Sequence, residues 1–189
     1  MWIAGIGKSL VHLLRDGYQS RHGGLQGLSF EMFSTSSFEG TPINKVSMFL
    51  YRIEIDPTRR HKELPPPTPA DPPRTALALD LRYLLTVWMS DAEREQQILQ
   101  DCMEILEERA ILSGPLLDPA YPWQPEDALR VYLDSVSHED MMRLWDLLDP
   151  KYRLSVPYVV RTAKLSPAAV SASAPPVLSR TNVYSPRLP

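Results

Sequence analysis

The sequence is poor in cysteine, and this scarcity limits its redox and metal chemistry. One cysteine, Cys102, occurs among 189 residues, so neither an internal disulfide nor a site of several cysteine ligands can form. Cys102 falls on an apolar stripe with helical spacing, which predicts a buried thiol that packs as a small hydrophobic group. We therefore expect the chain to fold in a reducing compartment, the cytoplasm.

Long hydrophobic runs are also absent. No apolar stretch approaches the roughly 18–20 residues that a transmembrane helix needs, and the first residues lack the basic-then-apolar order of a signal peptide. With 43% hydrophobic and 23% charged residues, the composition is that of an ordinary soluble globular protein. The length predicts one domain with extensions and no membrane association.

Acidic residues are missing from the C-terminal part of the chain. After Asp149 there is none, while six basic residues follow it: Lys151, Arg153, Arg161, Lys164, Arg180 and Arg187. Since the net charge is -3, the first 149 residues carry -9. This split indicates an acidic body with a basic tail that meets an acidic partner. Nucleic acid is the rival partner, but six charges spread over forty residues are too dilute to favour it.

Recognisable catalytic and metal motifs are lacking as well. The four histidines are His12, His22, His61 and His138, and none lies three or four residues from another, so no helical metal-binding pair exists. Gly5 to Ser9 resembles the end of a phosphate-binding loop, but Trp2 replaces its first glycine and no strand precedes it. We expect no metal, no cofactor and no small-molecule substrate.

Ser137 and His138 are the one adjacent pair that invites a catalytic interpretation. Ser137 has no G-x-S-x-G elbow, and a serine that caps a helix is the plainer account. A small hydrolase whose site forms only between subunits remains a third hypothesis, which loses its basis if replacing both residues has no effect. The sequence predicts that the protein is not an enzyme.

The clearest structural signal lies between Thr75 and Leu112, where a strand leads into a helix. Apolar residues alternate from Leu77 to Met89, and Asp80 and Arg82 on the opposite face suit solvent or a paired edge. The second half of this strand is apolar on both faces, as in a central strand. Ser90 is predicted to cap the helix in a capping box with Glu93, and Gly114-Pro115 to end it.

Weaker patterns complete a mixed α+β fold. A helix is predicted over 2–16 with Gly17 as its stop, and another from Ser137 to Pro150. Further strands are predicted over 28–33, 44–55, 128–135 and 154–160, with 34–41 as a polar loop. Pro157 places the last strand at an edge or at a bulge, because proline cannot donate to a ladder. The total is five strands and three helices.

Two segments are rich in proline. Six of the nine residues 65–73 are prolines, which excludes helix and ladder pairing there and favours an extended crossing within an insert loop over 56–75. The basic tip of the insert, at Arg59, Arg60, His61 and Lys62, is either a partner contact or a solvated loop. Residues 165–189 are rich in Pro, Ala, Ser and Val and cannot build a core. We therefore expect a folded domain over 1–164 and an extended arm over 165–189.

One resemblance covers most of the chain. The strands Val46–Glu54 and Leu79–Trp88, the helix Glu93–Ala110, and the later segments 129–133, 137–145 and 152–160 resemble one bacterial family. These are the terminator or cap proteins of extracellular contractile injection systems of the anti-feeding prophage and Photorhabdus virulence cassette type. The resemblance spans residues 2–164 and consists of fold signatures without catalytic motifs.

The resemblance implies a tail-terminator-like α+β fold: a mixed, mainly antiparallel sheet of about five strands packed against helices, with an extended Pro-rich C-terminal tail. It also implies a hexameric ring that ends the inner tube and fastens the last ring of the contractile sheath. Tube protein, sheath protein and further copies of the chain are the partners expected. Such a particle is assembled in the bacterial cytoplasm and can be released.

Partner contacts are expected in the insert and in the arm. The residues predicted to bind partners are Arg59, Arg60, His61, Lys62, Val177, Leu178, Arg180, Val183, Tyr184 and Arg187. The two apolar arm segments could add a strand to an exposed sheet edge of the sheath. The alternative from another class is a non-enzymatic adaptor whose basic tail binds an anionic partner or nucleic acid.

Overall fold

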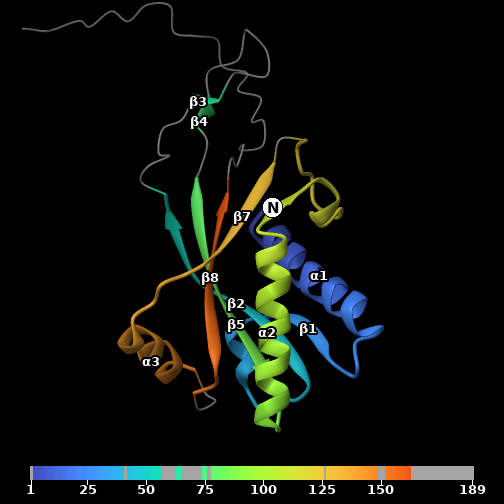
Figure 1. Ribbon diagram of the computed structural model, residues 1–189. Coiled ribbons are helices and arrows are strands. Elements are labelled where there is room, and N and C mark those ends of the chain that lie inside the picture. Colours follow the sequence, from blue (N-terminus) through green and yellow to red (C-terminus); the bar gives the residue numbers. More distant parts are fainter. Residues whose placement is uncertain are drawn as a thin grey trace, which may run out of the picture.

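The computed structural model describes residues 2–40, 42–56, 63–64, 74–75, 78–125, 127–148 and 152–162, which are built around one six-stranded sheet (Figure 1). The strand order is β1-β2-β5-β8-β7-β6. In that order the strands span Ser29–Phe33, Lys45–Ile55, Leu79–Trp88, Ser155–Thr162, Ala128–Leu133 and Ile111–Ser113. β1 is parallel to β2, and the other neighbouring pairs are antiparallel. The predicted α+β class is confirmed, with six strands in this sheet instead of about five.

Helices cover both faces of the sheet. The long helices α1 (Trp2–His22) and α2 (Ala92–Glu108) lie on one face, and the shorter α3 (His138–Asp146) lies on the other (Figure 1). The larger core lies under α1 and α2, where β5 contributes four fully buried residues: Leu81, Tyr83, Leu85 and Val87. Because β5 lies between β2 and β8, both of its faces are covered, as its doubly apolar second half predicts.

The smaller core lies under α3 and is mainly aromatic. It combines Phe33, Phe38 and Phe49 with Trp88 and Trp145. Phe38 comes from a short 3-10 helix, η1 (Thr35–Phe38), within the segment predicted to be a polar loop. Its ring is 1% exposed and packs edge-on against the rings of Phe49 and Trp145. A buried aromatic residue therefore anchors this connection to the sheet.

The first helix continues past its predicted stop. Gly17 lies inside α1, which ends at His22, and Gly23 follows with φ of 68°. A positive φ is nearly free of cost for glycine, so Gly23 is the residue that ends the helix. Gly17 is instead where α1 comes close to α2, because a Cβ built there would lie 2.7 Å from Cγ2 of Ile105. The prediction that Gly17 ends the helix is wrong.

The boundaries of the second helix also differ from the prediction. Asp91 is the N-cap of α2 in place of Ser90, and its carboxylate accepts a 2.8 Å hydrogen bond from the Arg94 amide, so there is no capping box with Glu93. The helix ends at Glu108, well before Gly114-Pro115, and the chain then forms β6. A strand of three residues that follows a helix directly gives too short a period to be recognised from the sequence. β6 is the strand of the six-stranded sheet that the sequence missed.

Pro157 lies in an interior strand, which contradicts the predicted edge position. β8 has β5 on one side and β7 on the other, and Pro157 is in register with Leu84. Its carbonyl faces β7, where it accepts a 2.9 Å hydrogen bond from the Asp134 amide just after β7 ends at Leu133. The N–H that proline lacks would also have faced β7. One hydrogen bond is therefore lost at the end of the β7–β8 ladder, and the interior of that ladder stays intact.

The two Pro-rich segments are described in part or not at all. β3 (Glu63–Leu64) and β4 (Arg74–Thr75) form a short antiparallel ladder that flanks the proline run of the insert. The prolines themselves, the basic tip and the predicted arm over 165–189 lie outside the described residues. The predicted division into a domain over 1–164 and an arm stays a prediction.

Candidate functional site

None of the ten predicted partner-binding residues belongs to the described part of the chain. The basic tip falls within 57–62, and the six arm residues fall within 163–189, so the structure does not test these assignments. The described residues offer three other surfaces: a polar cleft, an apolar groove and a charged half of the sheet.

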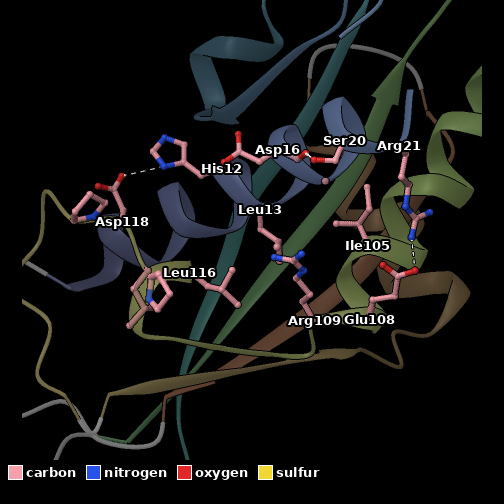
Figure 2. A pocket seen from close by; sticks show the side chains of 14 residues that line it. His12, Leu13, Asp16, Ser20, Arg21, Ile105, Glu108, Arg109, Leu116 and Asp118 are labelled. Carbon is pink, nitrogen blue, oxygen red and sulfur yellow. Dashed lines mark hydrogen bonds and ion pairs between the residues drawn. The ribbon is translucent and has the colours of Figure 1, made fainter. Parts of the chain in front are cut away.

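The polar cleft has a volume of about 350 Å³ and lies between α1, the C-terminal end of α2 and the segment 115–119 (Figure 2). On one wall, His12 Nδ1 lies 3.6 Å from Asp118 Oδ2. On the opposite wall, Arg21 donates a 2.6 Å hydrogen bond to Glu108 and a 2.8 Å hydrogen bond to Glu104. These acids and bases of the two walls are thus paired within the chain, whereas Arg109, which also lines the cleft, forms no ion pair with a described residue.

Asp118 has a structural role in this cleft. It is 5% exposed, and its side chain accepts a 2.8 Å hydrogen bond from the Ala120 amide. Its own amide donates to Ser9 Oγ at 2.8 Å, and the same hydroxyl donates to the Gly5 carbonyl at 2.8 Å. These contacts fasten the loop after β6 to α1, so the carboxylate holds a turn in place.

The cleft lacks the parts of a nucleophilic site among the described residues. The hydroxyl of Ser20, which also lines it, donates to the Asp16 carbonyl at 2.8 Å. Among the described residues, His12 forms no hydrogen bond with a serine, threonine or cysteine, so no activated nucleophile is assembled there. Cys102 is fully buried as predicted, and burial raises the pKa of its thiol to about 12, so the thiol stays protonated at neutral pH.

The Ser137-His138 pair also has no catalytic geometry. Ser137 is the N-cap of α3, where its hydroxyl accepts a 3.1 Å hydrogen bond from the Asp140 amide and donates to the Asp140 carboxylate at 2.7 Å. His138 is exposed in the first turn. The predicted capping role of Ser137 is confirmed.

The apolar groove lies beside the beginning of α1 and has a volume of about 410 Å³. Its lining residues are Trp2, Ile3, Ala4, Met32 and Leu50. Met32, on edge strand β1, is 40% exposed. In the register of the sheet, β1 ends at Phe33 opposite Phe49, so the rest of β2 extends beyond it. The groove can take up apolar side chains and contains no titratable group.

The third surface is the half of the sheet's second face that α3 leaves open. Arg82 on β5 donates a 2.6 Å hydrogen bond to Glu54 and contacts Asp134, and Arg161 on β8 lies 3.3 Å from Asp80. The contact with Arg82 lowers the pKa of Glu54, and its two carboxylate partners raise the pKa of Arg82. Asp80 and Arg82 thus join strands across the sheet, whereas the sequence predicted solvent or a paired edge.

Two further classes of site are not found in the described ranges. No cluster of three or more histidine, cysteine or acidic side chains there could hold a metal ion. None of the helices in those ranges is both long and apolar enough to span a bilayer.

Sequence reasoning missed both the cleft and the charged half of the sheet. His12 and Asp118 are 106 residues apart, and the charges on β2, β5, β7 and β8 meet only through the strand register. Alternation along one strand identifies a polar face but does not say which charges of other strands lie opposite. No local signal in the sequence could have found either surface.

Comparison with known proteins gives a matching family and several similar solved structures. A family model described as the Pvc16 N-terminal domain matches residues 5–179. The sheath/tube terminator of an extracellular contractile injection system, PVC, in its extended state is 20% identical, with a TM-score of 0.59 over 98% of this chain. The tube-terminating cap of the anti-feeding prophage is 18% identical, with a TM-score of 0.44 over 73% of this chain.

The aligned lengths differ between this chain and those structures. This chain covers 64% of the PVC terminator chain and 48% of the anti-feeding prophage cap. No curated protein matches the sequence. The likeness to the PVC terminator shows a shared fold.

Proposed function

Since the chain belongs to the Pvc16 N-terminal domain family, we propose that it is a structural cap of a phage-tail-like contractile injection system. Copies of the chain form a ring that ends the inner tube and fastens the last ring of the sheath. The observation that carries this proposal is the agreement of fold with a sheath/tube terminator over 98% of the chain. The family match over residues 5–179 supports it.

A ring explains how a structural protein can stop a polymer. A head-to-tail interface uses two different surfaces, and a ring that closes leaves neither surface free for further copies. One side of the ring matches the terminal ring of tube subunits, so tube subunits have no site for further addition. A six-membered ring, as the sequence resemblance implies, matches a six-fold tube.

The arm supplies the second function in this proposal. Residues 165–189 reach the sheath, and Val177, Leu178, Val183 and Tyr184 are the apolar side chains that anchor them. Six arms held by one ring bind together with a high effective concentration, so the sheath is retained even when each contact is weak. The basic residues Arg180 and Arg187 suit an acidic sheath surface.

The family and the similar structures are those of tail components, so we propose that the protein has a structural role and requires no cofactor and no small-molecule substrate. Assembly takes place in the bacterial cytoplasm, together with the tube and the sheath. The finished particle acts outside the cell.

The decisive measurement is the molar mass in solution by light scattering, with and without the tube protein. One chain has a mass of 21.5 kDa, so a hexamer has six times that mass, about 129 kDa. We expect this species alone or on addition of tube protein. A strict monomer that ignores the tube argues for the adaptor alternative, which nonspecific DNA binding with a steep salt dependence would support.

A truncated chain tests the arm separately. Deleting residues 166–189 should leave the number of chains in the ring unchanged and weaken retention of the sheath in a pull-down. A deletion within the insert is not a suitable control, because it shortens the connection between β2 and β5. Reversal of the exposed Arg143 on α3 is the matched control. Sheath retention equal to that of the full chain contradicts the role of the arm.

A further inference from the structure

The second face of the sheet has a half covered by α3 and η1 and a half that no described helix covers, which we call the open half. Its aromatic half is packed under α3 and η1, whereas the end of the sheet that carries Glu54 and Asp80 has no described helix over it. On this open half one row of side chains crosses five strands in register: Glu54, Asp80, Arg161, Arg130 and Ile111. The row begins acidic and ends basic and apolar.

Arg130 is the member of this row without a partner. It lies directly opposite Arg161 in the β7–β8 register, and it makes no hydrogen bond or ion pair with any described residue. Arg161 is bound to Asp80 at 3.3 Å and lies over the ring of Tyr132. Like charges directly opposite each other destabilise an antiparallel pair. Among the described residues, none offsets this repulsion at Arg130.

Exposed apolar side chains surround Arg130. Ile111 is its partner in the register and is 53% exposed, and Tyr132 is 40% exposed on the same strand face. We call Ile111, Arg130, Tyr132 and Arg161 the arginine patch. Arginine and tyrosine beside an apolar residue form the composition that dominates binding energy in protein interfaces.

An excess of negative charge lies at the C-terminal end of α2. This helix carries six acidic residues and one basic residue, and its last turn has no basic residue. Arg21 binds both Glu104 and Glu108, but the exposed Glu107 makes no ion pair with a described residue. A carboxylate is disfavoured there by the helix dipole and by Glu104 three residues earlier.

These two sites cannot satisfy each other within one chain. Glu107 belongs to α2, which covers the first face of the sheet (Figure 1). Arg130 points to the second face, because its neighbours Leu129 and Val131 pack into the core under α1 and α2. The sheet itself separates the unpaired acid from the unpaired base.

We propose that the arginine patch of one copy docks on the C-terminal end of α2 of the next copy, with Arg130 facing Glu107. The proposal rests on the ring proposed above and identifies its subunit interface. The two surfaces are different and lie on opposite faces of one sheet, so the contact is head-to-tail, as a closing ring requires. Glu107 of each copy then compensates the repulsion between Arg130 and Arg161 of one neighbour. Arg130 of the same copy compensates the charge of Glu107 in the other neighbour.

Charge reversal with complementation tests this interface. Arg130→Glu and Glu107→Arg are each expected to abolish the ring, or to raise the concentration for half-assembly by at least about tenfold. An equimolar mixture of the two variants restores the ring, because each new charge meets its opposite on the next copy. Light scattering measures the mass in all three samples.

Both variants are expected to fold, because each new charge is favourable within its own monomer. Arg130→Glu places a carboxylate opposite Arg161, and Glu107→Arg places a cation at a helix C-terminus, so neither change should lower the melting temperature of the monomer. The matched controls are Arg143→Glu and Glu139→Arg, which reverse an exposed ion pair on α3. Both controls should assemble as the wild type does.

The outcomes separate this inference from the proposed function. Wild-type rings together with unaffected reversal variants overturn the inference and leave the cap function standing. A mixture that fails to restore assembly of two folded variants also overturns it, as does loss of tube or sheath binding by rings of normal mass. A wild-type chain that stays monomeric with and without tube protein contradicts the proposed function itself.

Discussion

Replacing Gly17 by alanine should destabilise the protein, although alanine is the better helix former. The added Cβ would lie 2.7 Å from Cγ2 and 3.1 Å from Cγ1 of Ile105, which is buried in α2. Ile105 is β-branched and stiff in a helix, so it cannot turn away. Overpacking of this kind costs about 1–3 kcal/mol, and the gain in helix propensity is about 1 kcal/mol. We expect a net loss of about 1 kcal/mol.

Gly7→Ala is the matched control on the same helix. The Cβ added at Gly7 would meet Sδ and Cε of Met32, the end of a flexible and 40% exposed side chain. Because Met32 can move away, helix propensity decides the result, and the free energy of unfolding should stay unchanged or rise by up to about 1 kcal/mol. Urea denaturation followed by circular dichroism measures both variants.

A double variant tests the cause of the Gly17 effect. Ile105→Ala alone should cost about 2–5 kcal/mol as a large-to-small change in the core. In that background Gly17→Ala meets no clash, so it should stabilise the protein by about 1 kcal/mol. If Gly17→Ala is as stable as the wild type, or destabilises equally in both backgrounds, the close approach of α1 and α2 does not govern this position.

Three further predictions concern buried polar groups. Arg82→Met should lower the free energy of unfolding at pH 7 by about 2 kcal/mol. Because the pKa of Glu54 is lowered in the folded state, the wild type should lose this advantage over the variant as the pH falls below about 4. Urea titrations of both proteins at several pH values measure the difference. Trp88→Phe should lower the free energy of unfolding, measured by thermal unfolding, by about 1–2 kcal/mol more than Trp145→Phe does. The reason is that Trp88 Nε1 donates a 2.8 Å hydrogen bond to a buried serine, whereas Trp145 Nε1 has no partner among the described residues. Equal losses in the two variants would contradict this reason. Cys102 should react with a thiol reagent only in denaturant, and rapid labelling of the native chain would refute its burial.

Local patterns predicted the fold class because they report burial. The alternation on β5, the capping serine of α3 and the apolar stripe around Cys102 each depend on neighbours within a few residues, and the structure confirms all three. Element ends were less predictable. Gly17 has the chemistry of a helix stop, but α1 continues because α2 packs against it there, and that contact lies 88 residues away in sequence.

The candidate surfaces were beyond local patterns for the same reason. The sequence identified charged residues on each strand, and the register alone brought Arg130 opposite Arg161 and Arg82 beside Glu54. Pro157 is a similar case. It is tolerated inside the sheet because the β7–β8 ladder ends at Leu133 and Tyr158, one residue before an N–H at position 157 would have had to donate to β7. The residues predicted to bind partners lie outside the described chain and stay predictions.

Residue patterns along the chain thus predicted the three helices, five of the six strands of the main sheet and the apolar faces that these elements bury, and they identified the family that the chain resembles. These properties follow from periodicity and residue type, which act over one or two turns of chain. The tertiary structure decided which charges meet and which remain unpaired, because electrostatic pairing depends on distances between strands that are far apart in sequence. Arg130 and Glu107, which have no ion-pair partner among the described residues and lie on opposite faces of one sheet, are a consequence of that arrangement.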